Sequence, residues 1–446
     1  STVVAGLIAA YLGYTWDDII ESIVGKLSKT MPAILILIIV GFLIGTWMIG
    51  GTIPMMVYYG IKVISPKYLI ITSFWVTAFV SVATGTSWGS AGTIGVALMG
   101  VASGIGAPLP VVAGAVVSGA YFGDKLSPLS DSTNLAPIAA GTTLYEHIGS
   151  MLYTSIPSFI IASIVYFVVG LKIDVGTVAT PEKVTTILST LEELFSFNIL
   201  IILPVVIVLA GSIMKKPTIP VMLFASIIAM FNAVFFQHFT LQQAFTSALS
   251  GFDTEMLLQI GYDPANLIGD LNVLLNRGGM ESMLGVTLLA FCAYGFAGTI
   301  SVTGSLDIVL SKFMKSVHSI GGLITTTLIA TFITVIVTSN GQLSLLIPGE
   351  MFRKTYLERK IHPKVLSRTL EDGATVIEPL VPWTAAGAYM AATLGVATLE
   401  YLPWAVFNYL GLVFAIIYGF TNTFIPKLSE DDEVYQEYLR EISEEA

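Results

Sequence analysis

Long apolar runs without a central charge recur along the chain. A membrane-spanning helix needs about 20 such residues, and seven runs come close to that length or exceed it. They cover residues 31–53, 154–171, 197–214, 218–236, 283–302, 320–338 and 402–421. This pattern predicts an all-α, polytopic membrane protein.

The start of the chain has a different pattern. Residues 2–12 are apolar but too short to span a bilayer, so we expect them to be the end of a helix whose upstream part precedes the chain. Residues 16–29 place Ile19, Ile23 and Leu27 on one face, which is typical of an interfacial amphipathic helix. Residues 172–196 and 237–280 are polar connections.

Four polar interruptions fall inside otherwise apolar segments. They lie at residues 84–90, 123–134, 338–342 and 378–383. Irregular backbone at membrane depth is tolerated only where protein or water satisfies it. Transporters place substrates and ions at such breaks, so the pattern predicts re-entrant hairpins and broken transmembrane helices.

The interruptions also repeat along the sequence. A shift of 254 residues brings Thr84 onto Thr338 and Asp124 onto Glu378. Paired interrupted segments are typical of internal structural repeats in transporters. We therefore expect a truncated first helix with the amphipathic helix (1–30), a first repeat (31–152), connecting helices and loops (153–280), a second repeat (281–401), and a last helix with an acidic tail (402–446).

Charge predicts that the two repeats are inverted. A basic cluster at residues 353–368 is expected to be cytoplasmic by the positive-inside rule. Its counterpart at 99–114 carries no charge, so the equivalent loops are expected on opposite sides. Inversion requires that one broken element of the first half crosses the membrane and that the other is a hairpin that returns to the side from which it entered. We favour 68–105 as the hairpin, with its tip at 84–90, although the pattern leaves the other choice open.

Composition supports lipid as the solvent for most of the chain. Hydrophobic residues make up 54% and charged residues 11% of the 446, with a mean hydropathy of +0.83. Soluble domains carry about a quarter charged residues. The net charge is −10, partly from the acidic tail, which we expect to be a solvated cytoplasmic end. The single cysteine, Cys292, excludes an internal disulfide and is expected to be packed in the core.

The richest candidate site lies in the second interruption. Asp124, Lys125 and Asp131 are ionisable groups between apolar half-helices, and such groups are functional by default inside a membrane. Neutral oxygens accompany them at Ser132, Thr133 and Asn134. The alternative is an aqueous loop with a helix cap. Hard cations prefer oxygen ligands, so we expect a sodium site formed by Asp131, Ser132, Thr133, Asn134 and Thr84.

The roles of the charged residues follow from this chemistry. Asp131 is the better candidate for direct ligand or proton carrier, because a carboxylate that binds either sodium or a proton is sufficient for exchange. Asp124 and Lys125 are neighbours in sequence. They could form a mutual ion pair, or Lys125 could act as an internal cation that competes with sodium.

The other interruptions supply further ion- or proton-binding candidates. Those of the first half are Thr84, Thr86 and Ser87, and tight helix packing is their alternative role. Those of the second half are Glu378, Thr338, Ser339 and Asn340, of which the last three are expected to face the first-half break. Glu371 and Asp372 are also open candidates, since Arg368 could pair locally with either.

The same residues bear on two other function classes, an enzyme and a channel. Gly85, Ser87 and Gly89 match the Gly-x-Ser-x-Gly pattern of serine nucleophiles. A nucleophile needs a base in reach, and the four histidines lie in polar flanks or loops, so an enzyme is not expected. A channel would need a continuous polar stripe and no paired broken helices.

Two stretches carry a family resemblance. Residues 85–95 (GTSWGSAGTIG) and 123–134 (GDKLSPLSDSTN) resemble signature stretches of the NhaC family of sodium/proton antiporters. The resemblance implies exchange of Na⁺, and also Li⁺, for H⁺ in a prokaryotic cell membrane. It further implies no cofactor, no nucleic-acid partner, a homodimer, a scaffold and a transport domain, and an elevator-like motion. The same family includes a malate/lactate exchanger coupled to sodium and protons, which stays as the alternative.

Overall fold

The structure is a computed structural model of the whole chain. It describes residues 2–172, 181–214, 216–267, 269–305, 308, 319–432, 434–436 and 438–440. Every regular element within these ranges is a helix, and the only β-type pairing there is an isolated bridge between Ile361 and Lys427. The predicted all-α class is therefore confirmed.

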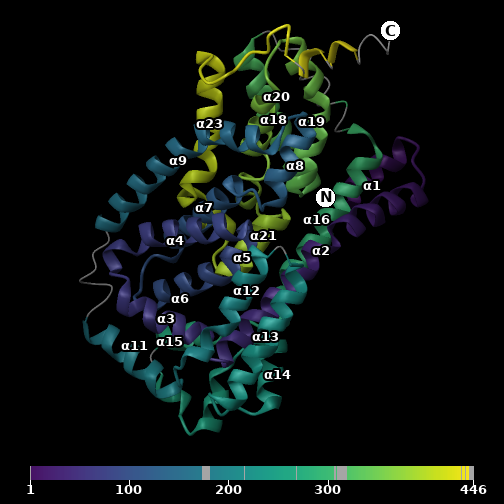
Figure 1. Cartoon of the computed structure of the whole chain (residues 1–446). Coiled ribbons are helices and arrows are strands. Elements are labelled where there is room, and N and C mark those ends of the chain that lie inside the picture. Colours follow the sequence, from purple (N-terminus) through teal and green to yellow (C-terminus); the bar gives the residue numbers. More distant parts are fainter. Residues whose placement is uncertain are drawn as a thin grey trace.

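The first helices form an extended arm (Figure 1). α1 (Thr2–Tyr11) and α16 (Leu284–Val302) pack along α2 (Trp16–Ile49). α2 is one helix of 34 residues, opened by a capping box of Thr15 and Asp18. The predicted separation of an amphipathic helix from a span at residue 30 is therefore wrong. The polar residues of the first turns occupy one face and contain no helix stop, so the helix continues through Pro32.

The predicted span 31–53 ends earlier than expected. Gly51 has φ +80°, a conformation that glycine adopts at little cost. The chain bends there by 70° into α3 (Thr52–Val63).

The next segment contains both first-half breaks. α4 (Leu69–Thr84) is followed by α5 (Ser87–Ser90), a π-helical turn at Ala91–Gly95 and α6 (Val96–Gly104). α7 (Leu109–Leu126), α8 (Asp131–Ala140) and α9 (Leu144–Lys172) follow. The second break is narrower than the predicted 123–134. Asp124 and Lys125 lie in the last turn of α7, and only residues 127–130 leave the helix.

Connecting helices occupy the end of the molecule opposite the C-terminus (Figure 1). They are α11 (Pro181–Leu194), α12 (Leu203–Ile213), α13 (Thr218–Phe235), α14 (Leu241–Ser250) and α15 (Gly269–Leu275). α16 packs on α2, α1, α18 and α21. Cys292 in α16 is exposed, so its predicted core position is wrong.

The second half contains the other two breaks. Its helices are α18 (Ile320–Thr338), α19 (Gly341–Glu358), α20 (Pro363–Gly373), a 3-10 turn at Glu378–Leu380, α21 (Ala385–Leu394), α22 (Thr398–Tyr401) and α23 (Val406–Thr421). α18, α19, α20 and α23 gather near the C-terminal end of the molecule (Figure 1).

Local structure recurs at the 254-residue spacing. The residue after α4, Gly85, and the residue after α18, Ser339, are both left-handed, with φ of 69° and 56°. The hydroxyls of Thr84 and Ser90 lie 3.2 Å apart, and those of Thr338 and Ser344 lie 3.3 Å apart. Corresponding residues therefore hold the two breaks in the same way.

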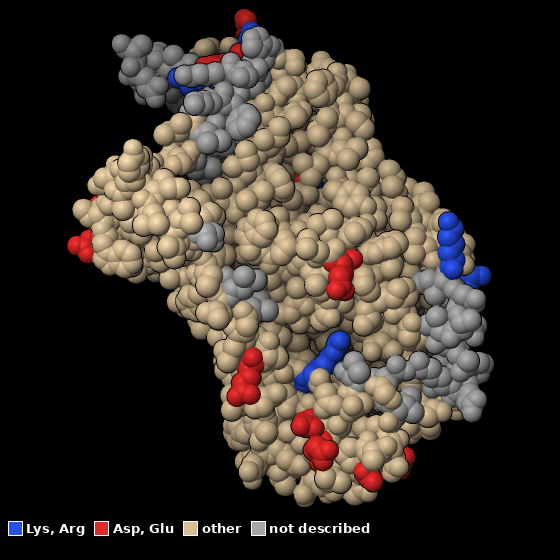
Figure 2. Space-filling model, turned by 180° about the vertical axis from the view of Figure 1, so that it is seen from behind, with Lys and Arg blue, Asp and Glu red and all other residues tan. Residues whose placement is uncertain are grey.

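The surface fits a lipid environment. Among the described residues, four helices are long and apolar enough to cross a membrane, and up to seven spans result if each sharply bent pair counts as one. Among the described residues on the face drawn in Figure 2, charged side chains form a few scattered spots between uncharged ones.

Candidate functional site

The broken helices meet at a cavity of about 950 Å³. Its walls come from the ends of α4 and α7, the starts of α5, α8, α19 and α21, and parts of α2 and α13. Nine of the predicted site residues line it: Thr84, Thr86, Ser87, Asp124, Asp131, Ser132, Asn134, Asn340 and Glu378. The structure thus brings residues of all four sequence breaks to one place.

Asp124 is held by the facing break. It lies in the last turn of α7, and its Oδ2 accepts a hydrogen bond of 2.9 Å from the Ser87 hydroxyl at the start of α5. The Thr133 hydroxyl donates to the backbone carbonyl of Asp124 at 2.9 Å. The carboxylate is thereby fixed at the cavity wall, with the hydroxyls of Ser87 and Ser130 as its neighbours.

Glu378 is the counterpart of Asp124 in the second half. Its carboxylate faces the first turns of α19 and α21, toward the backbone N–H groups of Gly341 and Ala386. A Cβ atom on Gly341 would collide with this carboxylate. Gly341 is therefore required for Glu378 to approach the helix start, where unpaired N–H groups favour negative charge.

Asp131 has a more open setting. It is the first residue of α8 and is exposed at the cavity wall. Ser132 lies beside it, 3.1 Å from the Ser130 hydroxyl. The Asn134 amide donates to the carbonyls of Pro128 and Ser130 at 2.9 and 2.7 Å, which closes the turn.

Of the other predicted second-half residues, only Asn340 lies at the cavity wall. Thr338 and Ser339 do not line the cavity, whereas Asn340 does. The Asn340 side chain caps α19 by accepting from the N–H of Leu343 at 3.0 Å. The buried Ser339 hydroxyl has no hydrogen-bond partner among the described residues.

Lys125 does not pair with Asp124, so the mutual ion pair, one of the two alternatives for Lys125, is not formed. Its ammonium pairs with Asp372 on α20, and both side chains are fully buried. The reason is helical geometry, because neighbours in a helix point in different directions. Asp372 also accepts from Thr154 at 3.3 Å. Lys125 therefore joins α7 to α20 and α9, away from the cavity lining.

Arg368 and Glu371 are both enclosed by the protein. Arg368, the last residue of the basic cluster, is 1% exposed and donates to the carbonyls of Ser150 and Phe424 at 3.5 and 3.3 Å. α20 is packed on several sides, so its basic residue is enclosed. Glu371 accepts from the Thr375 hydroxyl at 2.7 Å. Within the described part of the chain, the Arg368 guanidinium is not within ion-pair distance of Glu371 or of Asp372, which pairs with Lys125.

Sequence reasoning missed several residues of the cavity. Trp88 and Tyr389 stack with ring centroids 4.3 Å apart, and the Tyr389 hydroxyl donates to the Trp88 carbonyl at 2.6 Å. Tyr121 and Lys216 also line the wall. Aromatic residues in apolar helices look like packing residues, and a lysine between two spans looks like a loop residue, so the sequence contained no specific signal.

The cavity is acidic. Asp124, Asp131 and Glu378 line it, and Lys216 is the one cation among its described lining residues. Such a wall favours a cationic ligand. The Ser87 hydroxyl donates to Asp124, and the described lining contains no histidine that could act as its base.

Comparisons with known proteins agree with this chemistry. A sequence profile of the Na⁺/H⁺ antiporter family matches residues 119–423. An uncharacterised Na⁺/H⁺ antiporter of Haemophilus influenzae is 56% identical over 96% of this chain and 91% of its own length. The malate-2H⁺/Na⁺-lactate antiporter of Bacillus subtilis is 38% identical over 95% of this chain and 88% of its own. The Na⁺/H⁺ antiporter NhaC of Alkalihalophilus pseudofirmus is 34% identical over 95% and 89%.

These relatives cover nearly the whole chain, and the family profile spans both breaks that carry Asp124 and Glu378. Together with the apolar helices, they identify an integral membrane protein whose relatives are transporters. The chain belongs to the Na⁺/H⁺ antiporter family.

Proposed function

We propose that the protein exchanges Na⁺, and also Li⁺, for H⁺ across a prokaryotic cell membrane. The observation that carries this proposal is the acidic cavity, in which Asp124, Asp131 and Glu378 face one space of about 950 Å³. A carboxylate in this setting binds either a hard cation or a proton. Competition between the two is sufficient to couple their fluxes.

Asp124 is the central exchange residue in this proposal. Ser87 orients its carboxylate, and Thr133 holds the backbone beside it. Glu378 holds the matched position in the second half. Asp131, Ser132, Asn134, Thr84 and Thr86 complete the oxygen-rich wall that accepts Na⁺.

The two halves are proposed to be inverted repeats with re-entrant hairpins. The matched caps after α4 and α18 support this idea, as do the matched hydroxyl pairs beside them. In this arrangement the basic cluster at 353–368 is cytoplasmic. The divisions at residues 152, 280 and 401 are proposed to separate the two repeats from the connecting helices and from the last helix.

Alternating access is proposed to be elevator-like. The segment from α4 to α9 and the segment from α18 to α23 pack against one another and contain all four breaks. They form the moving transport domain, while α2, α3 and α12–α16 form the scaffold, with a homodimer as the assembly. In this proposal Na⁺ is a transported ion, and the exchange uses no cofactor.

The alternative is malate/lactate exchange coupled to Na⁺ and H⁺, which the name of the Bacillus subtilis relative suggests. The starts of α8, α19 and α21 at the cavity could receive an organic anion. A dicarboxylate favours arginine forks, and Lys216 is the one cation in the described lining. The charge of the wall therefore favours the cation exchange.

Transport by variants in proteoliposomes tests the site. Asp124→Asn should abolish Na⁺-driven proton movement, because an amide cannot alternate between proton and cation. Asp131→Asn should also abolish it if Asp131 carries the proton, as the sequence predicts. Lys67→Gln, an exposed residue of the connection before α4, is the matched charge control. Full exchange in a well-folded Asp124→Asn protein would remove that residue from the mechanism.

Labelling tests the inversion independently. Cysteines introduced at Ser103 and Lys360, in a Cys292→Ser background, should react from opposite sides of the membrane. Reaction of both from the cytoplasm would rule out the inverted repeat.

A further inference from the structure

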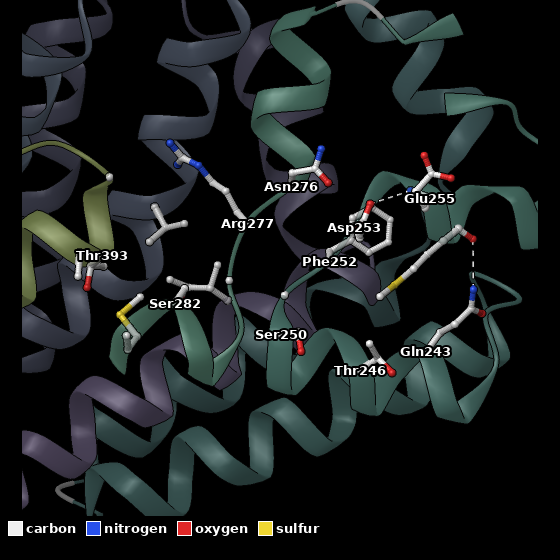
Figure 3. Close-up of a pocket in the computed structure, with 18 residues that line it drawn as sticks. Gln243, Thr246, Ser250, Phe252, Asp253, Glu255, Asn276, Arg277, Ser282 and Thr393 are labelled. Atoms are coloured by element: carbon white, nitrogen blue, oxygen red, sulfur yellow. Dashed lines mark hydrogen bonds between the residues drawn. The ribbon is translucent and has the colours of Figure 1, made fainter. Parts of the chain in front are cut away.

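A second cavity, of about 770 Å³, lies between α14, the connection at residues 251–256, the connection at 276–283 and the end of α21 (Figure 3). It shares no lining residue with the acidic cavity. Its walls come from helices of the proposed scaffold on one side and from α21 on the other.

Arg277 is presented to this cavity on a firmly held loop. Its backbone N–H donates to the carbonyl of Leu275 at 2.7 Å, and its carbonyl accepts from the N–H of Phe252 at 3.1 Å. Gly279, with φ +84°, donates to the carbonyl of Gly41 on α2 at 2.8 Å. Because both flanks of Arg277 are anchored, little freedom is lost when its side chain binds a ligand.

The guanidinium of Arg277 has no partner within the described part of the chain. No acidic side chain there is within ion-pair distance, and no side-chain hydrogen bond is formed. A Cβ atom on Gly395, the left-handed cap of α21, would lie 3.0 Å from one guanidinium nitrogen. Arg277 is half-buried and faces the end of α21 with its fork of donors unused.

A second donor at the same cavity is also unpaired. The Thr393 side chain on α21 is 3% exposed, and its hydroxyl has no hydrogen-bond partner of ordinary geometry among the described residues. The Tyr389 hydroxyl is its polar neighbour and itself donates to the carbonyl of Trp88 at 2.6 Å. In Figure 3, Thr393 and Arg277 lie at one end of the cavity and Asp253 and Glu255 at the other.

The remaining walls define the ligand further. Asp253 and Glu255 are exposed, and Asp253 already accepts from the N–H of Glu255 at 2.9 Å. Two acidic groups at the far end disfavour a multiply charged anion. Ile44, Val96 and Met283 form an apolar wall, which suits the body of a small organic molecule.

We propose that this cavity binds a small monocarboxylate, with the carboxylate on the Arg277 fork near Gly395 and Thr393 in the adjoining wall. Arginine matches a carboxylate with two parallel hydrogen bonds. The site is separate from the exchange site and does not depend on which ion is exchanged. The bound carboxylate bridges the loop before α16 to the end of α21.

Lactate is the probe in the test. Thermal unfolding of the purified protein in detergent is followed at a constant total sodium concentration while sodium lactate progressively replaces NaCl. A saturable rise in melting temperature is expected. Lactamide, the neutral analogue, should have no effect. A response to lactamide equal to that of lactate, or no saturable rise with lactate, would overturn the proposal.

Variants assign the response to Arg277. Arg277→Gln should weaken the apparent affinity for lactate at least about tenfold, since it removes a charged hydrogen-bond donor. Arg277→Lys, which keeps the charge and loses the fork, should weaken it less. Lys67→Gln should respond as the wild type does.

Three further outcomes would contradict the assignment. An unchanged lactate response in Arg277→Gln and Arg277→Lys would exclude this residue. Loss of the response in Asp124→Asn, with Arg277 intact, would place lactate in the acidic cavity. Chloride that competes with lactate at equal concentration would identify an inorganic anion site in place of a carboxylate site.

Discussion

The buried pair of Lys125 and Asp372 gives the sharpest prediction for stability. Both side chains are fully buried, and the pair connects α7 of the first half to α20 of the second. Gly411 on α23 makes room for it, since a Cβ atom there would lie 2.6 Å from the Asp372 Oδ1. Removal of one partner leaves an uncompensated charge, which costs about 3–5 kcal/mol for buried pairs.

Lys125→Met and Asp372→Asn should therefore each lower the free energy of unfolding by about 3–5 kcal/mol. The double variant Lys125→Met/Asp372→Asn should lose clearly less than the sum, because no lone charge remains buried. Unfolding in mixed micelles with increasing SDS measures all four proteins in a double-mutant cycle. Losses that add fully would refute the pairing. A Lys125→Met protein of wild-type stability and higher Na⁺ affinity would instead support Lys125 as a competitor of sodium.

Three further predictions rest on local features of single residues. Gly341→Ala should abolish exchange in the proteoliposome assay with little loss of folded protein, because its Cβ occupies the position of the Glu378 carboxylate. Gly85→Ala should lower the free energy of unfolding by about 1–2 kcal/mol, and Ser339→Gly should raise it by about 1 kcal/mol, because both positions have left-handed backbone. Changes of the same sign for both variants in SDS unfolding would contradict this. Burial and the charge of Lys364 lower the pKa of His362, whose Nδ1 accepts from the Lys364 N–H. The unfolded chain therefore takes up this proton more readily than the folded protein, so thermal stability should fall as pH drops below about 6.5. The fall should be smaller in His362→Asn.

Much of the fold could be predicted because lipid imposes a simple rule on helices. Apolar length located α13 and α18 to within a residue of their observed ends. Helix ends that depend on the conformation of a single backbone residue were harder to predict from the sequence. The bend at Gly51 depends on a left-handed glycine, and a sequence with many glycines does not indicate which one turns the chain.

The site was predicted in part for a similar reason. Asp124, Ser87 and Glu378 could be selected because polar groups in apolar segments are costly, and all three line one cavity. Their partners could not be selected. Lys125 is adjacent to Asp124 in sequence, yet the helix turns it toward Asp372, 247 residues away. Such pairings depend on how whole helices pack, which side-chain patterns do not encode.

The central claim is that the acidic cavity exchanges Na⁺ for H⁺ without an organic substrate. The most direct test is a pH-sensitive dye inside proteoliposomes that contain the purified wild-type protein, with a Na⁺ gradient and no organic acid present. We predict an immediate internal pH change that reverses with the direction of the gradient, also occurs with Li⁺, and is absent with K⁺ and in Asp124→Asn. A pH change that appears only when malate or lactate is added would contradict the claim.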